Sequence, residues 1–197
     1  YKVYDETGCQ LVPEKIERLV EIINELPNEL DVTYVPEADK GQIITLGSKI
    51  DDDYVKDVEK IAINTSLKKE GFKIVFTPNH GTSYVNAMRV FKDLGYEVYP
   101  LLKQCTPDPD FSGTLSPNPE DKRSFIEPIN YAKEIDADLI VMTDPDGDRC
   151  GLGFLASDGT YKTLTGNQSA AMLIDYIFSK KKAAGTLSKN GVMYNTI

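Results

Sequence analysis

The chain has 197 residues, a formal net charge of −9, and 41% hydrophobic against 27% charged residues. This composition is typical of an ordinary globular protein, and the acidic balance argues against a nucleic-acid partner, which needs clustered Lys and Arg. No apolar run approaches the roughly 20 residues that span a bilayer, so we expect no membrane partner. Three widely spaced cysteines indicate neither a disulfide framework nor a zinc site, and they are typical of the cytoplasm.

The first 53 residues carry few predicted elements. We expect two short strands in residues 1–12 around the turn at 5–8, then a helix that Pro13 begins and Pro27 ends. Residues 28–53 lack a sustained period and are expected to form a linker, with an ambiguous short strand at 42–46. The acidic run 51–53 is expected to start a helix, where carboxylates interact favourably with the helix dipole.

From residue 53 onward, helices and strands alternate. The pattern predicts helices at 54–70, from Tyr84 to Gly95, at 121–135 and at 165–180, and strands at 72–76, 96–101, 139–143, 151–155 and 191–197. This alternation predicts an α/β fold: a three-layer α/β/α domain with a mainly parallel mixed sheet, flanked by partial α/β domains. Ligands of such sheets gather beyond the carboxyl ends of the strands. The loops around His80 and Asp144 both lie at such ends.

The most informative motif follows the strand that ends at Thr143. It places carboxylates on alternate positions and an arginine directly after them: Asp144, Asp146, Asp148 and Arg149. Three carboxylates that approach one point repel each other unless a cation lies among them, and oxygen ligands of this kind suit Mg²⁺, Mn²⁺ or Ca²⁺. Arg149 adds a planar donor group that suits a phosphate. We therefore predict a metal and phosphate site, with Cys150 beside it as a small buried residue.

Two other interpretations of this motif fit less well. An EF-hand loop needs Gly where Arg149 stands and a bidentate Glu where Leu155 stands. A phosphatase of the haloacid-dehalogenase type also carries Asp-x-Asp after a strand, with Asp144 as its nucleophile, but it usually has Thr or Val at the position of Asp148. A solvated acidic turn without an ion is the remaining alternative.

Several motifs together resemble the α-D-phosphohexomutase family, which includes phosphoglucomutases and phosphomannomutases. The metal motif at 144–149 resembles that family's metal-binding loop, and the order and spacing of the motifs agree over nearly the whole chain. The other matching segments are 1–4, Asn79-His80-Gly81, 107–111, 116–120 and Thr165-Gly166-Asn167-Gln168. The Asp-Pro-Asp-Phe segment leans towards the phosphoglucomutase and phosphopentomutase side of the family.

The resemblance implies a protein of four similar-sized domains around a central cleft. It implies that residues 1–50 are the tail of the first domain plus a linker, 51–157 the complete second domain, and 158–197 the beginning of the third. The family's Ser-His-Asn-Pro loop would precede Tyr1, which is not an initiator Met. We therefore expect a fragment that is inactive by itself.

The resemblance also implies a reaction and roles for residues. A phosphoserine donates its phosphoryl group to a phosphosugar, which gives a bisphosphate intermediate, and the other phosphate returns to the serine. The three aspartates would hold Mg²⁺, and glucose 1,6-bisphosphate would act as activator. Arg149 would contact the transferring phosphate or steady the loop. Lys2 matches the family's candidate general base, and His80 is either a contact to the serine loop or a structural histidine.

One alternative function from another class stays open. The chain could be a non-catalytic α/β module that binds a divalent ion or phosphate for regulation or assembly. Neither the choice among glucose, mannose and pentose phosphates nor the oligomeric state follows from the sequence, and carboxylates alone do not decide between Mg²⁺ and Mn²⁺.

Overall fold

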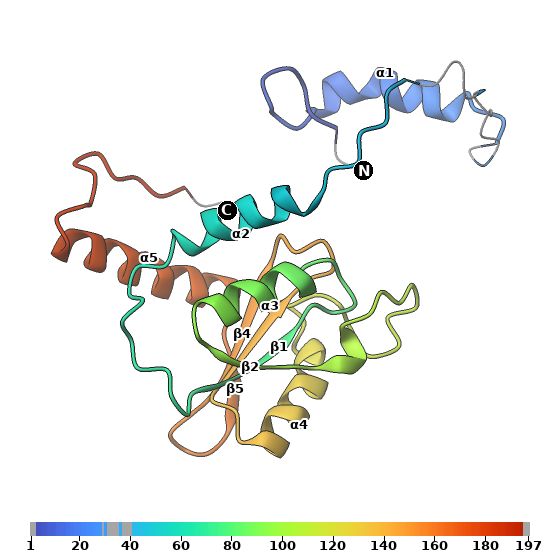
Figure 1. Ribbon diagram of the computed structural model, residues 1–197. Coiled ribbons are helices and arrows are strands. Elements are labelled where there is room, and N and C mark those ends of the chain that lie inside the picture. Colours follow the sequence, from blue (N-terminus) through green and yellow to red (C-terminus); the bar gives the residue numbers. More distant parts are fainter. Residues whose placement is uncertain (1–2, 29, 31–35, 37–40, 195–197) are drawn as a thin grey trace. The chain divides into compact units, whose positions relative to one another are not determined.

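The computed structural model describes residues 3–28, 30, 36 and 41–194. The chain divides into two compact units, residues 1–45 and 46–197, and Figure 1 gives the course of each. No helix among the described residues is both long and apolar enough to cross a lipid bilayer.

The described residues of the first unit contain one helix, α1 (Pro13–Asn24), which begins at Pro13 as predicted. Where two strands were expected in residues 1–12, the described residues 3–12 have a single antiparallel bridge, between Tyr4 and Gln10, and residues 1–2 lie outside the described part. Asp5 closes the turn between them by accepting hydrogen bonds from Thr7 and Lys15. The ambiguous strand at 42–46 is absent, because these residues have no regular structure. None of the residues of α1 is buried, so the described part of this unit has no apolar core around its helix.

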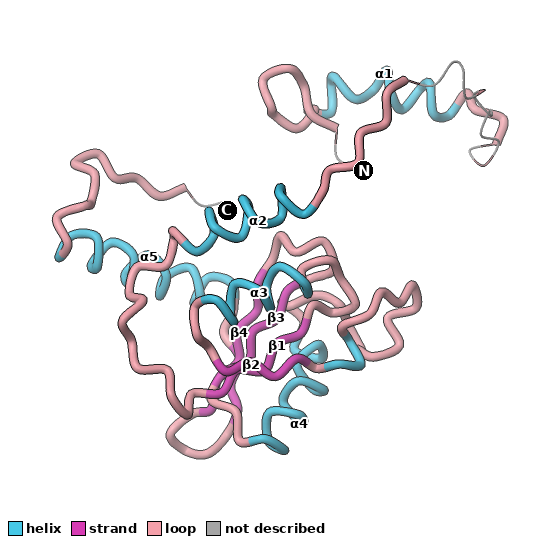
Figure 2. Tube along the Cα trace, viewed as in Figure 1, coloured by secondary structure: helices cyan, strands magenta, loops and turns pink. Residues whose placement is uncertain are grey.

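The second unit is built on a five-stranded sheet in the order β2-β1-β3-β4-β5, drawn in magenta in Figure 2. β1 (Lys73–Thr77) lies parallel to both β2 (Glu97–Pro100) and β3 (Leu139–Thr143). β4 (Cys150–Leu155) and β5 (Tyr161–Thr163) continue the sheet in antiparallel order. The predicted α/β fold with a mixed sheet is therefore confirmed. Only β5, a short strand, was not predicted.

Two helices cover opposite faces of the parallel part of the sheet. α3 (Tyr84–Asp93) connects β1 to β2, and α4 (Ile126–Ile135) leads back across to β3. Because such crossovers are right-handed and these two run in opposite directions, the helices lie on opposite faces, as Figure 1 shows. The 3₁₀ turns η2 (Leu102–Gln104) and η3 (Lys122–Phe125) lie in the long connection between β2 and α4.

The core lies between the sheet and α4. Alternate strand residues point to this face, and with residues before and in α4 they form one buried cluster: Val75, Phe125, Ala132, Ala137, Ile140 and Met142. On the opposite face Phe76 packs edge-on against Phe91 of α3, with 5.8 Å between ring centroids. Burial on both faces fixes the register of β1 and β3, and with it the position of the two loops that follow these strands.

The helix predicted at 54–70 is wrong in both bounds. α2 (Ser48–Glu59) begins six residues earlier and ends at Glu59, because the Asn64-Thr65-Ser66 segment that follows has low helix propensity. The aspartates expected at its start lie within it, and Asp52 forms an ion pair of 2.5 Å with Arg89 of α3. Ion pairing therefore accounts for Asp52 better than the helix dipole does.

The last helix, α5 (Gly166–Ala183), begins where the sequence predicts. Thr165 and Gln168 form a complete capping box, in which each side chain accepts from the other residue's backbone N–H. Residues 191–194 have no regular structure where a strand was predicted, and 195–197 lie outside the described residues.

Candidate metal centre at the end of strand β3

The three predicted ligands meet at one point after β3. Asp144, Asp146 and Asp148 each offer a carboxylate oxygen, and these oxygens lie within 4.8 Å of one another. Asp144 is fully buried, whereas the other two carboxylates are exposed. A set of three carboxylate oxygens at this spacing fits a hard divalent cation such as Mg²⁺.

Short-range contacts give the aspartate loop, residues 144–149, its shape. Gly147 has a φ of 77°, which favours glycine, and its N–H donates to the Asp144 carbonyl at 3.1 Å. The pairing of Thr143 with Cys150 closes the loop between two antiparallel neighbours. The chain therefore turns back tightly enough to bring alternate side chains to the same side.

Arg149 neutralises the buried carboxylate. Its backbone N–H donates to Asp144 Oδ1 at 2.9 Å and its Nε donates to Oδ2 at 2.8 Å. Burial raises the pKa of the Asp144 carboxyl, but these hydrogen bonds outweigh burial, so the pKa lies below its ordinary value. The Asp144 carboxyl group is therefore ionised at neutral pH.

Asn118 is a second partner of Arg149 that the sequence did not single out for this role. Arg149 Nη1 donates to Asn118 Oδ1 at 3.1 Å, and the same oxygen accepts from the Glu120 N–H at 3.0 Å. The turn at 116–120 thus orients the arginine. These contacts support the steadying role for Arg149, since two of its guanidinium nitrogens, Nε and Nη1, donate to groups within the protein.

The loop after β1, residues 78–83, packs against the aspartate loop. Thr82 N–H donates to the Pro145 carbonyl at 2.9 Å, and Ser83 Oγ lies 2.6 Å from Thr143 Oγ1. Ser83 does precede α3, but its side chain makes no capping hydrogen bond. The hydroxyl group of Ser83 therefore pairs with Thr143 and does not cap α3.

His80 lies in the same loop, and both of its ring nitrogens have backbone partners. Nδ1 lies 2.9 Å from the Thr106 carbonyl, and Nε2 accepts from the Gly113 N–H at 3.2 Å. Nε2 is thus an acceptor, and Nδ1 is placed to donate to the Thr106 carbonyl. The histidine thereby ties its own loop to residues 106–113, which favours the structural interpretation. The side chain is 7% exposed.

Two other sequence expectations have different outcomes. Lys2 lies outside the described residues, so its role as a base stays a prediction. Cys150 was expected to be buried, and this is wrong: it is exposed at the start of β4, where the strand emerges from the loop.

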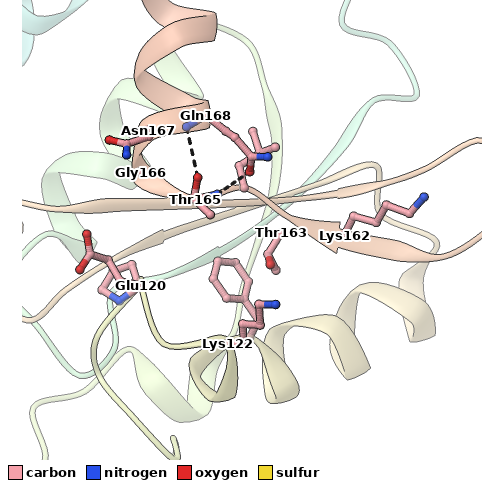
Figure 3. A pocket seen from close by; sticks show the side chains of 11 residues that line it. Glu120, Lys122, Lys162, Thr163, Thr165, Gly166, Asn167 and Gln168 are labelled. Carbon is pink, nitrogen blue, oxygen red and sulfur yellow. Dashed lines mark hydrogen bonds between the residues drawn. The ribbon is translucent and has the colours of Figure 1, made fainter.

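A cavity of about 700 Å³ is lined by residues of the 116–120 turn, of β5 and of the start of α5. Glu120 and Lys122 line it on one side, and Thr165 with the first turn of α5 lines it on the other (Figure 3). The Glu120 carboxylate, together with Asp144 and Asp148, raises the pKa of Arg149, with Asp144 contributing most. The cavity therefore lies between the 116–120 turn, whose Asn118 contacts Arg149, and the segment that leads into α5.

Comparisons with known proteins agree with this geometry. Residues 52–154 match the family described as phosphoglucomutase/phosphomannomutase, alpha/beta/alpha domain II. The chain is 33% identical over its whole length to a phosphoglucomutase of Staphylococcus epidermidis, and 34% identical over 92% of its length to a phosphomannomutase of Mycoplasmoides pirum. It spans only 35% and 33% of these relatives, respectively.

A solved structure shows the same fold. The crystal structure of a phosphoglucomutase/phosphomannomutase family protein from Burkholderia thailandensis is 24% identical to the chain, with a TM-score of 0.52. The match covers 67% of this chain and 26% of the other.

Proposed function

The chain belongs to the phosphoglucomutase/phosphomannomutase family, and from this membership we propose that it is the metal-binding middle of a phosphosugar mutase. The mutase would interconvert sugar 1-phosphate with 6-phosphate, or with 5-phosphate for a pentose, through a phosphoserine and a bisphosphate intermediate. One observation carries the proposal: three carboxylate oxygens within 4.8 Å of one another follow β3 in the domain that matches this family.

The residues of this chain would bind and orient rather than react. Asp144, Asp146 and Asp148 would hold Mg²⁺, and the bound ion would draw charge from a phosphoryl oxygen. Asp144 is buried and ionised, so it would anchor the ion, while the two exposed carboxylates leave the outer side open to a phosphate. Arg149, held by Asp144 and Asn118, would keep the loop in shape beside that phosphate.

Further parts of the proposal concern the longer protein. Lys2 would serve as general base for the sugar hydroxyl, and His80 would order the loops of this domain. Residues 1–50, 51–157 and 158–197 would belong to the first, second and third domains, respectively. We infer a cytoplasmic protein that uses glucose 1,6-bisphosphate as activator, and a 197-residue chain that is inactive alone because the serine loop lies outside it.

The test uses the protein extended through the flanking segments that its relatives have. With glucose 1-phosphate, a trace of glucose 1,6-bisphosphate and Mg²⁺, we expect glucose 6-phosphate to form. Asp146→Asn should abolish this activity, whereas Asp175→Asn, an exposed residue on α5, should leave it unchanged. The 197-residue chain should show no turnover. Absence of turnover with every hexose and pentose phosphate would contradict the mutase assignment and leave the ion-binding module.

A further inference from the structure

The loop after β1 adopts an unfavourable backbone. Asn79 and His80 are consecutive non-glycine residues with φ values of 46° and 62°, in the left-handed region that costs free energy at residues with a Cβ. Such strain persists only where the surrounding structure enforces it, and it is found preferentially at functional sites. The contacts that these two residues and their loop make therefore indicate which part of the site depends on the strained backbone.

The Asn79 side chain is fully buried and reaches the base of the aspartate loop. Its Nδ2 donates to the Thr143 carbonyl at 2.9 Å. Its Oδ1 is buried with no hydrogen-bond partner among the described residues, which is unfavourable. Asn79 thus combines a strained backbone with an imperfectly satisfied amide, so stability alone does not explain this residue.

The same loop holds the carbonyl groups on both sides of Asp144. Asn79 Nδ2 binds the carbonyl that precedes Asp144, and the Thr82 N–H binds the carbonyl of Pro145, which follows it. Glycine at position 81 allows the two loops to approach this closely. A Cβ there would lie 2.3 Å from Pro145 Cα and 2.3 Å from the Pro145 carbonyl oxygen, which is a steric clash. The peptide groups that flank the buried carboxylate are therefore fixed from outside its own loop.

We propose that Asn79 is a positioning residue for the aspartate loop: its amide fixes the Thr143 carbonyl and so aims the Asp144 carboxylate at the point where the three carboxylates meet. This inference rests on the proposed metal site for its consequence, but the positioning itself is testable without an ion. Partners that orient metal ligands from outside the ligand set commonly change metal affinity by about 10- to 100-fold.

A matched control separates positioning from ordinary stability. Ser124 is also buried, and its Oγ also donates one hydrogen bond to a backbone carbonyl, that of Asp121 at 2.6 Å. Ser124→Ala therefore removes a comparable hydrogen bond in η3 rather than at the aspartate loop. Both Ser124→Ala and Asn79→Ala should lower the thermal midpoint of the 197-residue chain, but only Asn79→Ala should disturb the aspartate loop.

Two readouts test this difference. Amide hydrogen exchange without metal reports on Gly147 and Arg149, whose N–H groups bind the Asp144 carbonyl and Oδ1. We expect exchange at both to be about tenfold faster in Asn79→Ala than in Ser124→Ala, with Val75 of the core as the internal reference. Titration with Mn²⁺ should show binding weakened by about 10- to 100-fold in Asn79→Ala alone. An aspartate at position 79 has the same shape as the asparagine but no N–H donor for the Thr143 carbonyl. Asn79→Asp therefore replaces Asn79→Ala in both measurements if the alanine variant does not fold.

The outcomes separate the two proposals. If the Asn79 and Ser124 variants show equal hydrogen exchange at Gly147 and Arg149 and equal Mn²⁺ affinity, the positioning role is overturned. Binding of Mn²⁺ by the wild-type chain would still support the metal site in that case. If the wild-type chain binds no Mn²⁺ but the Asn79 variant still loosens Gly147 and Arg149, the metal site fails and the positioning of the loop stands.

Discussion

Asp121 shows how one residue makes the stability of this fold depend on pH. Its carboxylate accepts hydrogen bonds from the Arg123 side chain and from the Arg123 N–H at the start of η3. The Arg123 guanidinium, and then the Arg123 backbone, hold the pKa of the Asp121 carboxyl well below its usual 3.8. A lowered folded-state pKa contributes stability that is present above the usual pKa and is lost as pH falls through the lowered one.

We therefore expect Asp121→Asn to remove this dependence. The free energy of unfolding of the wild type should exceed that of the variant by a constant amount between pH 7 and pH 5, and the difference should shrink below about pH 4. Urea unfolding of both proteins at pH 7, 5 and 3 measures this difference in the free energy of unfolding. Arg123→Gln, which removes the largest cause of the shift but keeps the backbone N–H donor, should give the same pattern with a smaller amplitude. A difference that does not change with pH would contradict the explanation.

The site was predictable at the residue scale only where its parts are close in sequence. Asp144, Asp146, Asp148 and Arg149 lie within six residues after one strand, so their spacing alone brought them together in the prediction. Asn79 and Asn118 reach the same loop from 64 and 31 residues away. No local pattern encodes such contacts, since they arise from the adjacency of β1 and β3 and from the path of the 116–120 turn.

At the scale of elements, β4 offers a test of how tightly the sheet packs on its neighbours. A Cβ on Gly151 would lie 2.8 Å from Pro119 Cβ and 3.0 Å from Phe125 Cζ, whereas a Cβ on Gly153 would meet its nearest neighbours at 3.4 Å. Both glycines are buried in the same strand and two residues apart, so each controls for the other.

Gly151→Ala should lower the free energy of unfolding by about 1–3 kcal/mol, because the added methyl group must displace packed atoms. Gly153→Ala should cost less than about 1 kcal/mol, since its surroundings need to give by only a few tenths of an ångström. Urea unfolding of both variants at neutral pH provides the comparison. Equal losses would show that backbone conformation, which the two substitutions share, determines the effect.

Elements were predictable where a buried apolar run or a cap defines them. The strands around Val75 and Ile140 and the capped start of α5 were found, although with small errors at strand ends. The end of α2 was missed because Ile61 and Leu67 continue an apolar pattern past the helix, and β5 was missed because three residues carry too little pattern. The existence of β5 depends on its ladder with β4, which is a tertiary interaction.

At the scale of the whole molecule, the two units should differ in what they contribute to stability. Residues 46–197 contain the sheet and its buried cluster, while α1 of the first unit buries none of its residues. A chain of residues 46–197 should therefore unfold within about 2–4 °C of the intact chain, the shift that 1 kcal/mol causes at this size.

Thermal unfolding followed by circular dichroism measures this shift. A chain of residues 1–163 is the matched control, because it loses α5, whose Leu173 and Tyr176 line an apolar groove with α2 and α3 and whose Ser169 is buried. The loss of α5 should lower the midpoint by more than the loss of residues 1–45. The opposite order would mean that the first unit stabilises the sheet.

The antiparallel pairing of β3 with β4 has a consequence for the local unfolding of this edge of the sheet. The aspartate loop is the hairpin connection between these strands, and among the described strands β5 pairs with β4 alone. An ion bound by the three carboxylates would bind the closed hairpin alone, and by mass action it would add RT ln(1 + [ion]/Kd) to the free energy of opening. The free concentration of the ion in the cell would then determine what fraction of molecules has this edge of the sheet locally unfolded.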